Sequence, residues 1–231
     1  CDVILVKNKL IIFILFFSLA LPLAGVGFIG SQNLTNRSGM SVDNNFNLTY
    51  ESSGNFESSF GFFIYIDLPK KLTLELSSHM SQQNLDINIS MDNQSLNTNG
   101  ESELFSQYLT LRKNYKNYSI PVLAKFALNY GIGINTHQLS VPSISVLKDE
   151  YDTEDLNYIY NQISQNMYFD FPNPSLSSYQ KYEGVHFQLG SQIKLLMINL
   201  FATVKYTFLF TARNTHMKSF PSINIGIGWG I

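Results

Sequence analysis

Hydrophobic and polar residues alternate with a period of two along much of this chain. Between Phe56 and Leu68 the even positions are mostly Phe, Ile or Leu, while the odd positions mix Glu, Ser, Gly, Phe, Tyr and Asp. The segment Ile223–Ile231 is the most regular, with Ile or Trp on one face and Asn or Gly on the other. Because successive side chains of a strand point to opposite faces, this period indicates β-strands with one apolar face.

The pattern predicts eight strands and no membrane-spanning helix after residue 25. The predicted strands are Val26–Asn33, Phe56–Leu68, Leu72–Ser77, Tyr118–Phe126, Tyr130–Leu139, Val185–Lys194, Ile198–Phe210 and Ile223–Ile231. Such strands bury their apolar faces in one of two ways. A soluble barrel or sandwich turns them inward, whereas a membrane barrel turns them toward lipid and keeps polar groups inside.

The polar faces and the connections favour the membrane barrel. The polar faces carry mainly Gly, Ser, Thr, Asn and Gln, where a water-facing surface is normally dense in charge. Three short turns are predicted at Leu68–Lys71, around Leu128–Asn129 and at Leu195–Met197, and they alternate with long polar loops at about 34–55, 86–103, 140–182 and 212–219. Outer-membrane barrels have short periplasmic turns and long extracellular loops. We therefore predict an all-β, eight-stranded, antiparallel up-and-down transmembrane barrel with both termini on the periplasmic side.

Three segments resemble the small eight-stranded outer-membrane barrels of Gram-negative bacteria, the OmpA/OmpX-like "porin family" barrel domains. The stretch Tyr118–Phe126 is similar to that family's Y-x-I-P-x-x-x-K-Y/F strand. The segments Val204–Tyr206 and Ile223–Ile231 are similar to its last two strands, the latter through its Gly-x-Gly-x-Gly alternation. The resemblance extends over essentially all of the chain after the N-terminal segment. It implies a location in the outer membrane, and it carries no catalytic motif.

The N-terminal residues fit a secretory signal. Lys7 and Lys9 precede the apolar run Leu10–Phe17, and Ser18-Leu19-Ala20 has small residues at the positions that signal peptidase requires. The run is shorter than the ~20 apolar residues of a membrane-spanning helix, which is the alternative. We expect residues 1–20 to be a cleaved signal peptide and residues 21–231 to form the barrel, with cleavage near residues 24–25 as a second possibility.

Charge and cysteine content exclude several function classes. The 231 residues include 15 Lys and Arg against 17 Asp and Glu, a net charge of −2, so there is no basic surface for nucleic acid. Only 14% of the residues are charged, well below the usual share for soluble domains. The single cysteine, Cys1, leaves no disulfide framework and no Cys nucleophile deeper in the chain.

The predicted strands place a set of charged side chains on the inward face and a set of aromatic side chains on the lipid face. The inward set is Glu57, Asp67, Glu75, His79, Lys125, His186, Lys194 and Lys205. The lipid-facing and girdle set is Phe60, Phe62, Tyr118, Phe126, Tyr206, Phe208 and Trp229. Because an eight-stranded barrel is only wide enough to be filled by its side chains, we interpret the inward set as a salt-bridged plug. A Glu75–His79 hydrolase dyad is the alternative.

The long loop after residue 140 contains an acidic run followed by apolar residues at helical spacing. The acids are Asp149, Glu150, Asp152, Glu154 and Asp155, and the apolar residues are Leu156, Ile159, Ile163 and Met167. We expect a short amphipathic helix with Asp152 or Thr153 as its N-cap. The weaker alternative is a divalent-cation site, because hard cations bind carboxylate oxygens, although the spacing is not that of an EF-hand.

These observations predict a non-enzymatic outer-membrane protein with a structural or surface-interaction role through its long loops. The alternatives are a narrow porin-like channel and, less favoured, a lipid-modifying enzyme or protease. We expect no cofactor, no resident metal and no nucleic-acid partner. The expected partners are outer-membrane lipid, the barrel-assembly machinery and an extracellular ligand of unknown identity. We expect the barrel to be a monomer.

Overall fold

The computed structural model describes residues 24–92, 94–120, 124–165, 177–195, 197–210 and 217–230. The predicted signal peptide, its cleavage site after residue 20 and Ile231 lie outside these residues. The elements in chain order are β1 (Ala24–Leu34), β2 (Ser38–Asp43), β3 (Phe46–Ser52), β4 (Phe56–Leu68), a 3-10 turn (Pro69–Lys71), β5 (Leu72–Met91), β6 (Gln94–Ile120), β7 (Ala124–Pro142), α2 (Ile144–Glu150), α3 (Leu156–Gln165), β8 (Ser177–Leu195), β9 (Ile198–Leu209) and β10 (Phe220–Gly230).

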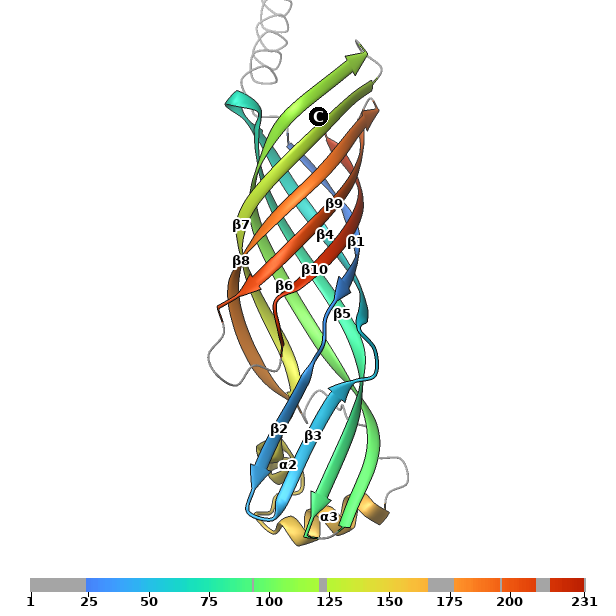
Figure 1. Ribbon diagram of the computed structural model, residues 1–231, viewed down its shortest axis with the longest axis vertical. Helices are drawn as coiled ribbons and strands as arrows, with labels where there is room; N and C mark the ends of the chain where they lie inside the picture. The colour runs from blue at the N-terminus through green and yellow to red at the C-terminus, as the bar shows by residue number, and fades with distance from the viewer. Residues whose placement is uncertain are drawn as a thin grey trace, which may run out of the picture.

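Eight of the strands close into a ring, which confirms the predicted fold class. The order β5-β4-β1-β10-β9-β8-β7-β6 is closed by pairing of β6 with β5, and all neighbouring strands are antiparallel. The ring is a tall, tilted barrel in Figure 1. The 3-10 turn lies at one end, which we call the turn end, and strands β1 and β10 pair there through Gly25 and Gly230. Helices α2 and α3 lie at the opposite end, which we call the loop end.

Strands β2 and β3 form a hairpin that continues the sheet beyond the ring. Strand β3 pairs with the distal half of β5, from Phe46 opposite Met91 to Ser52 opposite Leu85, so it follows the course of β4. Strand β2 pairs with β3 and continues β1 in the same way. The strands β2, β3 and the distal halves of β5 and β6, together with α2 and α3, form a body that we call the extension (Figure 1).

Within the ring, the outward side chains are mostly apolar, and the inward side chains are mostly polar apart from a cluster of aromatic rings. Strand β10 shows the pattern clearly, because its buried positions include Ser222 and Asn224 while Ile223, Ile225 and Trp229 are exposed. The exposed apolar side chains recur on all eight strands of the ring. A barrel with this pattern presents its apolar surface to lipid. In the described part of the chain, no helix is both long and apolar enough to cross a membrane.

The extension has its own apolar core. Helices α2 and α3 belong to this core together with the inner face of the extended strands and residues at the mouth of the barrel. Its fully buried members include Phe46, Leu48, Leu85, Ile87, Ile89, Leu147 and Ile159. Tyr50 is buried in the same core, and burial raises the pKa of its hydroxyl above the ordinary value. The long connections therefore form a compact folded body at the loop end of the ring.

One predicted strand and one predicted turn are wrong. The segment Tyr118–Phe126 is not one strand, because β6 ends at Ile120, β7 begins at Ala124, and Tyr118 pairs with Phe126. Leu128 and Asn129 lie within β7 and do not form a turn. The strand that was missed is β6 itself. Its alternation is obscured because the buried Leu104 and Tyr108 on its inner face are also apolar or aromatic.

Three of the predicted long loops are largely regular structure. Residues 34–55 contain the β2–β3 hairpin, and residues 86–91 and 94–103 belong to the paired distal halves of β5 and β6. Residues 140–182 contain α2, α3 and the start of β8. These segments were interpreted as loops because they are rich in Asn and Ser. The predicted turns at Leu68–Lys71 and Leu195–Met197 are confirmed as connections between successive strands.

Candidate functional site

The loop end of the ring interior is crossed by a buried ion pair. Arg37, between β1 and β2, pairs through Nη2 with Glu57 of β4, and both side chains are fully buried. Glu57 also accepts hydrogen bonds from Thr35 Oγ1 at 2.6 Å and from Ser81 Oγ. Arg37 Nη1 donates to the carbonyl and hydroxyl oxygens of Ser102 at 2.6 and 2.8 Å. Each charge is thus paired and hydrogen-bonded, as a buried charge requires.

Deeper in the ring, a layer of three histidines surrounds Tyr108 of β6. The rings of His79, His137 and His186 meet the Tyr108 ring edge-on, with centroid distances of 5.4, 5.4 and 5.2 Å. The Nζ atom of Lys205 lies 3.6 Å from the centroid of the same ring, which is a cation–π contact. All five side chains are buried, so this layer fills the width of the barrel.

One part of this layer has the arrangement of a catalytic triad. Asn135 Oδ1 lies 3.0 Å from His137 Nε2, and because the amide oxygen only accepts, Nε2 carries the proton. His137 Nδ1 therefore accepts from Ser106 Oγ at 2.7 Å. A nucleophile, a base and an orienting group are in hydrogen-bond contact, as nucleophilic catalysis requires. All three residues, however, are at most 4% exposed. This geometry supports a hydrogen-bonded interior and offers Ser106 no approach for a substrate.

The turn half of the interior is filled by aromatic rings and a second ion pair. Arg112 lies 3.2 Å from Glu75 and stacks over Phe201, with 5.3 Å between its guanidinium carbon and the ring centroid. Phe63 packs edge-on against Phe201 at 5.0 Å. A Cβ added to Gly228 would lie 2.9 Å from the Phe63 ring, so the glycines of the last strand make room for inward aromatic side chains.

The structure brings only part of the predicted inward set into the interior. Glu57, Glu75, His79, His186 and Lys205 are buried inside the ring, Asp67 and Lys194 are half-buried, and Lys125 is exposed. Asp67 lies at the turn end and accepts a hydrogen bond from Thr73 at 2.6 Å. Lys125 was expected inside because its register is inward, but it lies at the second position of β7, next to the connection from β6. Lys125 therefore does not belong to the salt-bridged plug predicted from the inward set.

The proposed Glu75–His79 dyad does not form. Glu75 pairs with Arg112, while the two ring nitrogens of His79 lie 3.2 Å from the hydroxyls of Ser31 and Ser77. Sequence reasoning missed Arg37, Arg112 and His137. His137 lies at an inward position of the predicted strand Tyr130–Leu139 and could have been found there. Arg112 lies on β6, which was not predicted, and Arg37 lies in a segment interpreted as loop.

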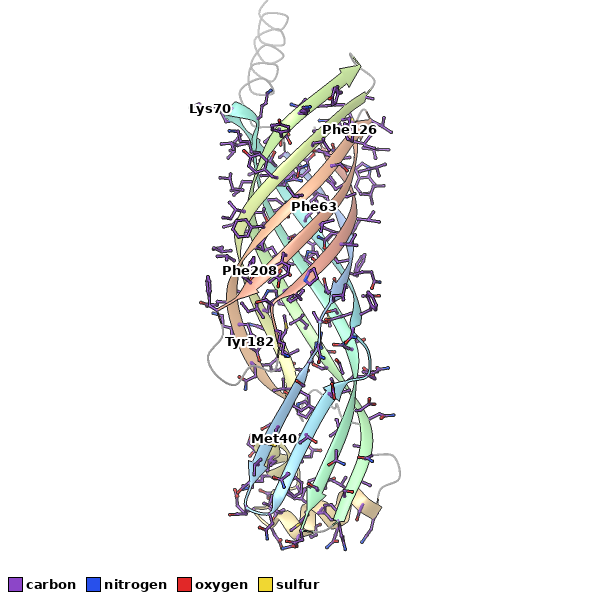
Figure 2. All side chains as sticks on the ribbon, viewed as in Figure 1. Met40, Phe63, Lys70, Phe126, Tyr182 and Phe208 are labelled. Atoms are coloured by element: carbon purple, nitrogen blue, oxygen red, sulfur yellow. The ribbon has the colours of Figure 1, made fainter. Side chains whose placement is uncertain are left out.

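The predicted aromatic set lies on the outside of the ring. Phe60, Phe62, Tyr118, Tyr206, Phe208 and Trp229 are exposed, and Phe126 is half-buried. Tyr118 and Phe126 stack across the turn-end hairpin at 6.3 Å. In Figure 2, Phe126 is labelled toward the turn end, which also carries Lys70, and Phe208 lies toward the loop end on the outer surface. Aromatic side chains therefore lie toward both ends of the apolar belt, as a membrane barrel requires.

The predicted amphipathic helix exists, but its N-cap differs. Helix α3 buries Leu156, Ile159 and Ile163, while Met167 lies outside the described residues. Asp155 is the cap, because its Oδ1 accepts from the amides of residues 157 and 158 at 3.0 and 3.3 Å. Thr153 instead accepts from the Asp155 amide at 3.1 Å.

The acidic run does not form a cation site in the described part of the chain. No three or more His, Cys, Asp or Glu side chains converge there as ligands. Asp149 and Glu150 end α2, and the α2–α3 connection carries Asp152, Glu154 and Asp155. Lys148 lies 2.6 Å from Glu154 and 2.7 Å from Asp43 of β2, and these hydrogen bonds raise the pKa of Lys148.

The outward face of the extension is acidic and shallowly hollowed. A groove of about 790 Å³ crosses β2, β3, β5 and β6. Glu51 and Asp86 face each other across β3 and β5 within it, and Asn99 continues the row on β6. Residues 38–52 and 84–103 contain six carboxylates and no Lys or Arg. The turn end instead carries lysines, among them Lys70 in Figure 2, so the barrel is charged oppositely at its two ends.

No protein-family model and no characterised protein matches the chain in sequence. Solved outer-membrane barrels match its fold. The outer membrane protein OprG from Pseudomonas aeruginosa matches with a TM-score of 0.52 at 12% identity, covering 91% of this chain and 96% of that one. The attachment invasion locus protein Ail of Yersinia pestis, in complex with the heparin analogue sucrose octasulfate, matches with a TM-score of 0.42 at 9% identity, covering 91% and 100%. The N-terminal barrel domain of Pseudomonas aeruginosa OprF matches with 0.37 at 10%, covering 90% and 99%.

Proposed function

We propose that this chain, which has the fold of the small outer-membrane β-barrel proteins, is a non-enzymatic surface-interaction protein. It displays the extension outside the cell on a barrel that does not conduct. The observation that carries this proposal is the apolar core shared by the extension strands, α2 and α3. Flexible loops do not need such a core, because it serves to hold a surface in one shape.

The filled interior argues against the channel alternative. The Arg37–Glu57 pair, the layer around Tyr108 and the contacts between Phe63 and Phe201 occupy successive levels of the ring. The buried Ser106 argues in the same way against a hydrolase.

The charge of the extension indicates which class of partner it favours. Four carboxylates lie on the outward strand faces, at Glu51, Asp86, Glu101 and Glu103, without a cation between them. Like charges opposite each other on a sheet repel, and a cationic partner relieves that repulsion. We therefore assign a cationic protein surface as the partner class, and a polyanion as a class that this face repels.

Two measurements test the proposal. The purified protein in planar bilayers is expected to give no conductance steps, and regular steps would instead support the channel. Cells that display the protein are expected to bind a fluorescent 20-residue polylysine more strongly than cells without it, and to bind heparin no better.

A charge-neutral variant sharpens the binding test. Glu51→Gln together with Asp86→Asn is expected to reduce polylysine binding several-fold, whereas Asp149→Asn together with Glu150→Gln at the end of α2 removes the same number of charges outside the groove and serves as the control. Equal binding by cells with and without the protein would overturn the assigned partner class.

A further inference from the structure

Three buried polar side chains in the turn half of the barrel interior have atoms without hydrogen-bond partners. Arg112 of β6, Asn129 of β7 and Gln188 of β8 are each at most 5% exposed. Within the described residues, no partner is found for Arg112 Nε and Nη2, Asn129 Nδ2 and Oδ1, or Gln188 Nε2. All of these atoms except Asn129 Oδ1 are donors. Because a buried donor without a partner is costly, the set indicates a bound species that accepts hydrogen bonds.

The strand register brings these side chains together around two glycines. One inward row crosses β6, β7, β8 and β9 in register: Arg112, Gly131, Gln188 and Lys205. A Cβ added to Gly131 would lie 3.1 Å from Cγ of both Arg112 and Gln188, so both stems lean over the glycine. In the neighbouring inward row Gly190 pairs with Asn129, and a Cβ there would lie 3.0 Å from Asn129 Oδ1. The unpartnered groups therefore lie around positions that have no side chain.

The charges of the ring interior do not balance. The buried charged side chains are three cations and two carboxylates: Arg37, Arg112, Lys205, Glu57 and Glu75. Each arginine pairs with one of the carboxylates, and no Asp or Glu of the described residues lies within ion-pair distance of Lys205. The half-buried Asp67 and Lys194 cancel each other at the turn end. Even with neutral histidines the interior has one positive charge in excess, and a buried charge is stable only when it is compensated.

We propose that the barrel binds one small inorganic anion, of the charge and size of chloride, between Arg112, Gln188 and Lys205. A halide accepts several hydrogen bonds and donates none, which matches a set of unpartnered atoms that are mostly donors. A water molecule must also donate, and it leaves the charge of Lys205 uncompensated. Larger anions do not suit an eight-stranded ring, whose interior is filled by side chains. The proposal concerns the ring interior and is independent of the surface role of the extension.

Exchange of the anion at constant ionic strength tests the site in the folded barrel. The purified protein in detergent micelles is unfolded with urea in sodium chloride and, separately, in sodium gluconate, whose anion is too large for the interior. Chloride at about ten times its dissociation constant is expected to lower the unfolding equilibrium constant about tenfold relative to gluconate, because it binds only the folded state. Identical unfolding curves in the two salts at every concentration would overturn the proposal.

Two glutamine variants distinguish a bound anion from a general effect of salt. Gln188→Leu removes a proposed donor and is expected to lose most of the difference between chloride and gluconate. Gln83→Leu is the matched control, because Gln83 is also buried with one unpartnered amide atom. That atom is the acceptor Oε1, while its Nε2 donates to the carbonyl of Gly54 at 2.6 Å. The control is expected to keep the full difference, and equal responses of the two variants would overturn the assignment of the site.

Crystals of the unaltered protein grown in sodium bromide locate the anion directly, so they decide the question even if Gln188→Leu does not fold. We expect an anomalous difference peak inside the ring, within hydrogen-bond distance of Gln188 Nε2 and Lys205 Nζ. Density at this place without an anomalous signal would identify water and would refute the proposed anion.

Discussion

Strand β5 belongs to both the ring and the extension, and its two halves have opposite polarity. In the ring its inward residues are polar and its outward residues mostly apolar: Thr73, Glu75, Ser77, His79 and Ser81 face inward, and Leu74, Leu76 and Met80 face outward. In the extension the inward residues are apolar and the outward residues polar: Leu85, Ile87 and Ile89 face inward, and Asn84, Asp86 and Asn88 face outward. The odd positions face inward throughout.

This difference shows that the medium around each half of β5 determines which of its faces is apolar. The register of the strand determines which residues point inward. The pairing of β5 with β6 runs without interruption from Leu72 to Met91, so no residue is inserted where the polarity changes. Around the ring the outer surface contacts lipid and must be apolar. Around the extension the outer surface contacts water, and the apolar residues turn inward to form a core. The change falls between Gln83 and Leu85, near the Arg37–Glu57 pair.

The largest expected effect comes from breaking that junction. Glu57→Leu leaves Arg37 charged and buried without its partner, which is expected to lower the free energy of unfolding by about 3–5 kcal/mol. The measurement is urea unfolding in detergent micelles, with the heat-induced mobility shift in SDS as a second readout. The double variant Arg37→Met/Glu57→Leu removes both charges and is expected to recover most of the loss. A single variant as stable as wild type would mean that the pair contributes little to joining the two regions.

Removing core volume from the extension is expected to destabilise the extension and leave the stability of the ring unchanged. Ile87→Ala empties part of a fully buried site, and such changes lower stability by about 2–5 kcal/mol. We expect faster protease cleavage within residues 38–52 and 84–103, while the heat-induced shift of the ring is unchanged. Asn88→Ala, the next residue on the outward face, is the control and is expected to stay within about 0.5 kcal/mol. Simultaneous loss of the ring would mean that the two regions unfold as one unit.

A lysine placed on each outer surface is expected to distinguish lipid from water. Ile225 on the ring is 68% exposed and Val42 on the extension is 53% exposed, so exposure alone predicts similar tolerance. Ile225→Lys is expected to destabilise the barrel in lipid vesicles by about 2–4 kcal/mol, the value for a lysine at the bilayer midplane. Val42→Lys is expected to change stability by less than about 0.5 kcal/mol. Guanidinium unfolding in vesicles measures both, and equal effects would contradict a boundary between them.

The same inversion explains how far the sequence predicted the fold. The alternation of apolar and polar residues identified seven of the ring strands. Among them are β4, β9 and β10, whose outward residues are exposed along nearly the whole strand. It failed beyond residue 84 of β5, where polarity reverses and the Asn-rich outward face resembles a loop. It also failed in β6, where Leu104 and Tyr108 lie inside the barrel.

The charged residues of the interior were predictable only where the odd or even position of a residue in its strand and its polarity both indicated the inward face. Glu57, Glu75 and Lys205 lie inside the ring as their odd positions predicted, and each directly follows an apolar residue that points outward. Which charges pair depends on contacts between separate elements, such as Arg37 ahead of β2 with Glu57 at the start of β4, and no local pattern contains that information. The extension core likewise depends on α2 and α3 folding back over strands that precede them by many residues.

The smallest expected effect concerns the contact of α2 with β2, and it depends on pH. Hydrogen bonds to Asp43 and Glu154 raise the pKa of Lys148 above its ordinary value, so the pair stabilises the fold while Lys148 is protonated. This contribution is complete below the unfolded pKa of about 10.4 and is lost as the pH rises through the folded value. We expect subtilisin to cleave the α2–α3 segment faster above that pH, with the difference abolished by Lys148→Met. High salt is expected to weaken the protection, because the pair is partly exposed and therefore screened. Parallel loss of protection in wild type and Lys148→Met would assign the pH dependence to another group.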